Sequence, residues 1–212
     1  MTKESEKEKT TTSATERPTL LKFCISSIAA GVCIGIAGLI YSRMVGTELG
    51  KFVGALSFSA GLYYVVLKGL TLYTGRIGFL SETVARFAIM LVMNFVGAGL
   101  AGAIAISAYD PDAIVKIAET KLALPYVEIF WRAFLCGMAM YFAVDGWKRT
   151  KSPFPVCLGV FVFVACGFEH CIADVFYFSA ASQIFTLQAW KFTFFAVLGN
   201  TVGAIFLQKV TG

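Results

Sequence analysis

Long apolar stretches follow one another through almost the whole chain, and this feature restricts the possible folds more than any other. From residue 20 to residue 209, long apolar segments alternate with short polar connections. A helix of about 20 apolar residues is long enough to cross the hydrocarbon core of a bilayer. Hydrophobic residues make up 58% of the 212 residues, against about 45–50% in an average soluble domain. The sequence therefore predicts an all-α membrane protein and leaves no room for a soluble catalytic domain.

Six transmembrane helices fit this pattern, and two of them are interrupted. The second and fifth are too long for simple spans, and each contains glycines and polar residues near its middle. Broken helices at membrane depth are tolerated only where they face protein or a water-filled cavity, and in transporters they frequently form the substrate site. We therefore expect the functional site at these two breaks. The predicted spans are residues 20–41, 52–81, 84–108, 126–147, 153–181 and 188–209.

The two halves of the chain resemble each other. An Asn-x-Val-Gly-Ala motif begins at Asn94 in the third span and again at Asn200 in the sixth, 106 residues later. The two interrupted spans are equivalent under the same offset. Because each half contains an odd number of spans, the halves must insert with opposite orientations. The prediction is an inverted 3+3 repeat with an aquaporin-like architecture, with halves at about 20–108 and 126–209.

The N-terminal segment differs from the rest of the chain. Residues 1–18 are almost wholly polar and lack the pattern of a signal peptide, so they predict a disordered tail before a channel domain at 19–212. Lys and Arg are concentrated in the segments that face inward if the N-terminus is cytoplasmic. We therefore expect a multi-pass protein of the inner or plasma membrane with both termini in the cytoplasm.

His170 is the only histidine, and it lies within the fifth span. An ionisable side chain in the hydrocarbon region is costly and usually marks a pathway or a proton relay; the alternative is a neutral histidine that only packs against its neighbours. Asp174 would share a helical face with His170 if the helix continues there. Glu169 would point elsewhere and could hold the break by accepting hydrogen bonds from backbone N–H groups.

The second span offers a hydroxyl at its break. Thr74 can donate one hydrogen bond to an anion, and Gly75 permits a backbone turn that exposes further N–H donors. The alternative is a plain loop.

The six cysteines lie in apolar stretches without a ligand cluster, so neither a metal nor another cofactor is expected.

Two motifs give these residues a family context. The segment Gly167–His170, continuing to Ala173, resembles the G-F-E-H-x-x-A signature of the formate/nitrite transporter family. The segment Leu72–Gly75 is similar to the L-F-T-[GS] loop that interrupts the second helix of that family. The two Asn-x-Val-Gly-Ala motifs also resemble its pattern, and the resemblance covers about residues 20–209.

The resemblance implies a homopentamer in which each protomer has its own pore for small monovalent anions such as formate, nitrite, acetate, lactate or hydrosulfide. It also implies roles for individual residues. The expected pathway has Thr74 and His170 as its central pair, with Leu72 and Tyr73 in the same loop and Lys121 as an attractor of anions. The expected apolar constrictions are Phe58, Leu62 and Phe163. The residues expected to support this pathway structurally are Glu169, Asp174, Gly75, Asn94 and Asn200.

Some residues depart from the family pattern. Gly137 occupies a position where many members carry asparagine, Asp174 stands where asparagine is common, and Lys68 is unusual inside the second span. These departures leave the transported anion open and keep a hydrosulfide channel as an alternative. Gly137 offers no side-chain donor, which would suit a small and weakly bonding anion.

The expected function is a passive or proton-coupled channel for small weak-acid anions, with protons and membrane lipid as further partners. Histidine has an ordinary pKa near 6.5, so His170 could lend a proton and let the anion cross as its neutral acid. A neutral-solute channel, an intramembrane enzyme using His170 with Asp174 or Cys171, and a scaffold are alternatives. The chain has no Asn-Pro-Ala turn, nucleophile motif or nucleotide motif, and its net charge of +5 is explained by anionic lipid rather than nucleic acid.

Overall fold

The structure is a computed structural model that describes residues 18–212 and is helical, without strands, over that range. The predicted polar tail falls outside the described residues, apart from Pro18. The helices are α1 (Leu20–Met44), α2 (Glu48–Leu67), α3 (Tyr73–Arg76), the 3-10 helix η1 (Ile77–Phe79), α4 (Val84–Ala108), α5 (Asp112–Leu122), α6 (Tyr126–Thr150), α7 (Phe154–Ala165), α8 (Cys171–Ala180) and α9 (Leu187–Thr211).

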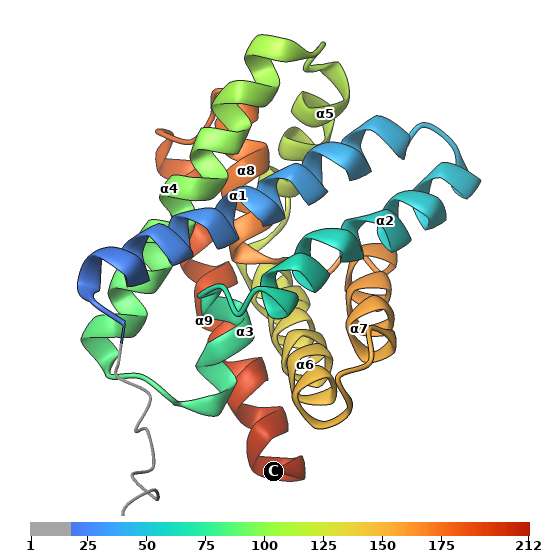
Figure 1. Cartoon of the computed structure of the whole chain (residues 1–212). Coiled ribbons are helices and arrows are strands. Elements are labelled where there is room, and N and C mark those ends of the chain that lie inside the picture. The colour runs from blue at the N-terminus through green and yellow to red at the C-terminus, as the bar shows by residue number, and fades with distance from the viewer. Residues whose placement is uncertain (1–17) are drawn as a thin grey trace, which may run out of the picture.

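Two crossing pairs of long helices, α1 with α4 and α6 with α9, form the frame of the protein (Figure 1). In the first pair, a Cβ atom on Gly31 would overlap the carbonyl oxygen of Asn94, and one on Gly97 would overlap the carbonyl oxygen of Ile28. Small residues let the backbones of membrane helices approach this closely. Gly31 and Gly97 therefore lie at direct backbone contacts between α1 and α4.

The second pair uses glycine in the same way and corrects one expectation. A Cβ atom on Gly137 would overlap the carbonyl oxygen of Asn200, and one on Gly203 would overlap that of Phe134. Gly137 therefore packs against α9 and has no space for an asparagine side chain. The sequence suggested that the missing side chain of Gly137 affects anion binding. This expectation does not fit the structure, because Gly137 faces the backbone of a neighbouring helix.

The breaks in the second and fifth spans have the same geometry. After α2, the N–H of Gly69 (φ +65°) bonds to the carbonyl of Val66 at 3.2 Å, and the N–H of Leu70 bonds to that of Val65 at 2.9 Å. This is a Schellman motif, in which a left-handed glycine ends the helix. Gly75, the expected turn residue, lies inside α3 instead, because the chain has already turned at Gly69.

The same motif ends α7. Gly167 (φ +67°) donates to the carbonyl of Val164 at 3.1 Å, and Phe168 donates to that of Phe163 at 2.9 Å. Residues 68–72 and 166–170 then continue without helical structure until α3 and α8 begin. The last two residues of each break, 71–72 and 169–170, are buried, so each break brings non-helical backbone into the protein.

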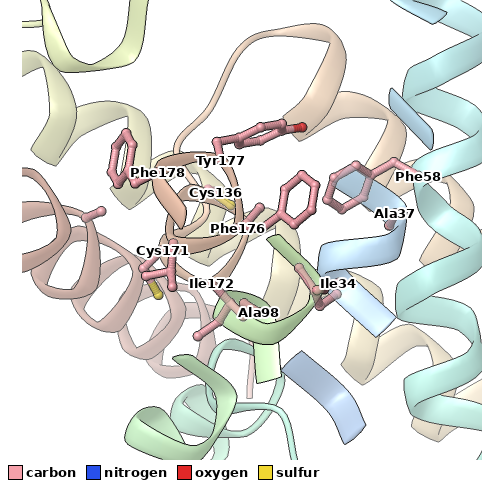
Figure 2. Packing of buried hydrophobic residues seen from close by; sticks show 14 of the residues in the cluster. Ile34, Ala37, Phe58, Ala98, Cys136, Cys171, Ile172, Phe176, Tyr177 and Phe178 are labelled. Carbon is pink, nitrogen blue, oxygen red and sulfur yellow. The ribbon is translucent and has the colours of Figure 1, made fainter. Parts of the chain in front are cut away.

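The short helix α8 lies at the centre of the core. Figure 2 shows Ile172 and Phe176 of α8 among Ile34 and Ala37 of α1 and Ala98 of α4, and all of these side chains are buried. The helix α5 was not predicted from the sequence. It lies at the upper end of the molecule in Figure 1, the end opposite the C-terminus, and it carries Lys121 in its last turn.

Within residues 18–212, five helices, α1, α2, α4, α6 and α9, are long and apolar enough to cross a membrane, whereas α7 and α8 are apolar but shorter. Large apolar side chains such as Ile104 on α4 and Phe206 on α9 are exposed on the surface. Such an apolar surface fits a lipid environment. In lipid, all backbone groups must also be hydrogen-bonded within the protein, as they are along an α-helix. The chain is a multi-pass membrane protein.

Candidate functional site

His170 ends the second break and is the N-cap residue of α8. Its Nδ1 accepts a hydrogen bond from the N–H of Ala173 at 3.2 Å, and its Nε2 lies 2.9 Å from Oγ1 of Thr74. The imidazole ring stacks on the ring of Phe163, with a centroid distance of 5.6 Å and an angle of 18° between the planes. His170 and Thr74 are both buried. The structure therefore brings together the two residues that the sequence predicted as the central pair.

The cap fixes the tautomer of His170. Because Nδ1 is an acceptor, the proton of the neutral ring is on Nε2, and Nε2–H donates to Oγ1 of Thr74. A second proton, on Nδ1, would remove the bond to Ala173. The hydroxyl hydrogen of Thr74 has no other bonding partner among residues 18–212, so its O–H is free to donate to an anion. Nε2–H becomes a second donor when an anion displaces Oγ1.

Asn94 of α4 holds the first break in place. Its Oδ1 accepts from the N–H of Tyr73 at 2.7 Å, and its Nδ2 donates to the carbonyls of Ser27 at 2.7 Å and Thr71 at 2.9 Å. The amide therefore bonds the non-helical backbone on both sides of Leu72. An asparagine can satisfy three backbone groups in this way because it has two donors and an acceptor.

Asn200 of α9 holds the second break with the same three bonds. Its Oδ1 accepts from the N–H of Cys171 at 2.9 Å, and its Nδ2 donates to the carbonyls of Ala133 and Glu169, both at 2.8 Å. We expected the Glu169 side chain to accept hydrogen bonds from backbone N–H groups at this break, but it does not. Asn200 accepts the backbone N–H bond instead, and the carboxylate of Glu169 bonds to Lys121.

Two cavities extend toward the Thr74–His170 pair from opposite ends. The cavity on the side of α5, called here the α5-side cavity, has a volume of about 900 Å³, and the cavity beside α3, called here the α3-side cavity, has a volume of about 230 Å³. His170 lines the first cavity, and Leu72 and Gly75, on either side of Thr74, line the second. One cavity is therefore lined by a member of the hydrogen-bonded pair, and the other by residues next to Thr74 in the chain.

The three predicted constriction residues flank this pair. The rings of Phe58 and Phe163 meet edge to face, with centroids 5.7 Å apart, and both line the α5-side cavity. Leu62 lines the α3-side cavity. All three side chains are buried. A path between the cavities would therefore pass two aromatic rings, the polar pair and then a leucine.

Lys121 does not project into the cavity as a free cation. Its ammonium bonds to the carboxylate of Glu169 and, at 2.9 Å, to Oδ1 of Asp174. The expected role of Lys121 as an attractor of anions stays a prediction, and in the structure two carboxylates compensate its charge. His170 and Asp174 share one turn of helix through the bond from Asp174 N–H to the carbonyl of His170, but their side chains have different partners.

Tyr73 and Lys68 have partners away from the two cavities. The hydroxyl of Tyr73 is 2.8 Å from Oγ1 of Thr201, so it supports the packing of α9 and lines neither cavity. The ammonium of Lys68 lies 5.9 Å from the ring centre of Tyr64 and also lines neither cavity. The bond of 2.7 Å between the hydroxyls of Ser27 and Thr71 could not be predicted from the sequence, because the two residues lie 44 positions apart in the chain.

Comparison with known proteins agrees with this arrangement. The sequence profile of the formate/nitrite transporter family matches residues 3–211. The chain belongs to the formate/nitrite transporter family. The two signature segments of the family, recognised in the sequence, are the two broken helices that meet at Thr74 and His170.

Relatives of the chain within the formate/nitrite transporter family include a formate channel and a nitrite transporter. The formate channel FocA of Haemophilus influenzae is 30% identical over 192 residues, covering 77% of this chain and 66% of that protein, so the match spans just under two thirds of the relative. The nitrite transporter NirC of Escherichia coli is 26% identical over 219 residues, covering 88% of this chain and 81% of NirC.

Solved structures confirm the fold of a formate/nitrite transporter. An FNT family ion channel superimposes with a TM-score of 0.80 at 21% identity, covering 90% of this chain and 88% of the other. A pentameric formate channel with formate bound superimposes with a TM-score of 0.78 at 23% identity, covering 90% and 94%. The helical architecture with two broken helices is therefore that of this family.

Proposed function

We propose that the protein is a channel for small monovalent anions such as formate or nitrite, and that the path runs from the α5-side cavity between Thr74 and His170 to the α3-side cavity. The observation that carries this proposal is the contact of 2.9 Å between Thr74 Oγ1 and His170 Nε2. His170 lines one cavity, and Leu72 and Gly75 near Thr74 line the other. Membership of the family and the two named relatives support small anions as the solutes.

The chemistry of the pair suits an anion. Moving a carboxylate-sized ion from water into a medium of low dielectric constant costs on the order of 20 kcal/mol in the idealised limit. Nε2–H of His170 and O–H of Thr74 can replace part of the hydration shell with charge-assisted hydrogen bonds. The rings of Phe58 and Phe163 on one side and Leu62 on the other would exclude larger solutes.

We also infer the finer architecture. The six spans form an inverted repeat, with α2–α3 and α7–α8 as the broken spans of the two halves. The matching Schellman motifs at Gly69 and Gly167 and the matching bonds of Asn94 and Asn200 support this repeat. Both termini are cytoplasmic in the inner or plasma membrane. The chain assembles as a homopentamer, an inference supported by its likeness in fold to a pentameric formate channel.

Flux measurements test the proposed function. The purified protein is placed in liposomes, and stopped-flow measurements compare formate, nitrite, acetate, lactate and hydrosulfide against empty liposomes. We expect formate or nitrite to enter without any added co-substrate, which also separates a channel from an intramembrane enzyme. A flux of hydrosulfide alone would select the hydrosulfide alternative. Entry of none of these anions would overturn the proposal.

A substitution at the aromatic pair tests the path. Phe58→Ala removes one of the two rings that meet over the α5-side cavity, so the constriction should widen. We expect the flux of lactate relative to formate to rise by about tenfold, the factor that corresponds to roughly 1.4 kcal/mol. Phe52→Ala on the same helix is the matched control, because Phe52 is exposed and stacks on Phe161 away from the cavity. If the flux of lactate relative to formate is the same in both variants, Phe58 does not line the path of the anion.

A further inference from the structure

We propose that Asp174 is a proton-binding site that controls anion entry at the deep end of the α5-side cavity, an inference that rests on the proposed function. With its carboxylate ionised, this end of the cavity carries an excess negative charge and repels anions. With a proton bound, Asp174 becomes a hydrogen-bond donor and the cavity admits an anion together with the proton.

The charges around Lys121 do not balance. One ammonium bonds to two carboxylates, those of Glu169 and Asp174, so the three groups sum to one excess negative charge when both acids are ionised. The side chains of Glu169 and Asp174 are 2% and 0% exposed, so water cannot screen this charge well. The N-terminus of α8 contributes only about half a positive charge and does not complete the balance.

One atom of this cluster has no partner. Oδ1 of Asp174 accepts from Lys121 at 2.9 Å, whereas Oδ2 is buried and has no hydrogen-bond partner among residues 18–212. A buried acceptor without a partner costs about 1–3 kcal/mol, and more when it is charged. A proton on Oδ2 removes the excess charge and turns this atom into a donor beside a cavity that Asp174 itself lines.

Other ionisable groups near Asp174 do not provide the missing charge. The nearby groups on packed elements are the phenols of Tyr41 and Tyr177, the thiols of Cys136 and Cys171, and the neutral ring of His170. None of these is a cation. Lys121 is therefore the positive side chain that neutralises this part of the cavity.

The rim of the same cavity has the opposite character. It is lined by basic side chains, two of which, Lys51 and Arg132, form ion pairs with Glu48 and Glu128. The other basic residues of the rim are Arg43 and Lys116. Anions are therefore concentrated at the mouth and then meet a negative region one helical turn from His170. A bound proton at Asp174 removes this barrier, which couples anion entry to acidity on the α5 side.

Asp174→Asn tests this site because asparagine has nearly the same shape, carries no charge and offers an N–H donor in place of the protonated oxygen. In liposomes, formate influx through the wild-type protein should increase as the pH on the α5 side falls. At mildly alkaline pH the variant should conduct about tenfold faster than the wild type, a factor expected from removing one unscreened charge nearby, and its flux should depend little on pH. Identical pH profiles for wild type and variant would overturn the inference.

An infrared titration gives a readout that does not depend on flux. The wild-type protein should show the carbonyl band of a protonated carboxylic acid as the pH falls, and the band should be lost in Asp174→Asn. In Glu169→Gln the band should appear only at a lower pH, because one ammonium then balances the one remaining carboxylate. Asp174→Ser provides a second neutral variant if asparagine prevents folding. Absence of the band in wild type would overturn the inference, whereas absence of anion flux at every pH would overturn the proposed function instead.

Discussion

Asn200→Leu is expected to prevent the protein from folding stably. The leucine side chain has a similar size but cannot bond to the N–H of Cys171 or to the carbonyls of Ala133 and Glu169. Each buried backbone group left without a partner costs about 1–3 kcal/mol, so the total loss is roughly 3–9 kcal/mol, a large part of the 5–15 kcal/mol that typically stabilises a folded protein. The measurement is the yield of monodisperse protein in detergent and its thermal stability.

A matched pair of variants separates this effect from general damage to α9. Val202→Leu changes an exposed residue of the same helix and should leave yield and stability unchanged. Asn94→Leu should be as damaging as Asn200→Leu, because Asn94 makes the equivalent three bonds to the first break. A stable and monodisperse Asn200→Leu protein would show that other groups hold the second break.

The sequence predicted the long helices well because their signal is local. The range 84–108 coincides with α4, and the other three simple spans start or end within a few residues of α1, α6 and α9. Apolar composition over about 20 residues is enough for such a prediction. The positions of the two breaks also followed from local signals, since glycines and polar residues interrupt the apolar runs at Gly69 and Gly167.

Contacts between distant segments could not be predicted in the same way. Lys121 follows a stretch that is too polar and too short for a span, and nothing in its neighbourhood indicates that α5 carries it to Glu169 and Asp174, 48 and 53 residues away. The motif containing Asn200 was visible, but its three backbone partners lie on other elements. The resemblance to the family relates Gly137 to anion binding, whereas its position is explained by backbone contact with α9.

His170→Asn is expected to lower formate flux by about tenfold while the protein remains folded. Asparagine is among the best N-cap residues, so it can replace the bond from Nδ1 to Ala173 N–H, but its shorter side chain cannot reach Thr74. Loss of one hydrogen bond costs about 0.5–1.5 kcal/mol, and about 1.4 kcal/mol is a factor of ten. The measurement is the initial rate of formate entry into liposomes, normalised to the amount of folded protein.

Thr74→Val removes the same contact from the other side and leaves the cap of α8 intact. If the two groups act as one site, the double variant Thr74→Val/His170→Asn should lose little more flux than either single variant. The reason is that the effects of substitutions at two residues in direct contact are not additive. His170→Phe should also lose stability, because it removes the cap, which is worth about 1 kcal/mol. Unchanged flux in all of these variants would show that the anion does not pass between Thr74 and His170.

The pH profile of His170→Asn distinguishes two sources of a transported proton. If His170 lent the proton, as the sequence led us to expect, the variant would lose its pH dependence. The bond from Ala173 N–H to Nδ1 requires a neutral ring with its proton on Nε2, and this ring donates a hydrogen bond without giving up a proton. We therefore expect His170→Asn to conduct slowly with the pH profile of the wild type, and Asp174→Asn to conduct fast without it.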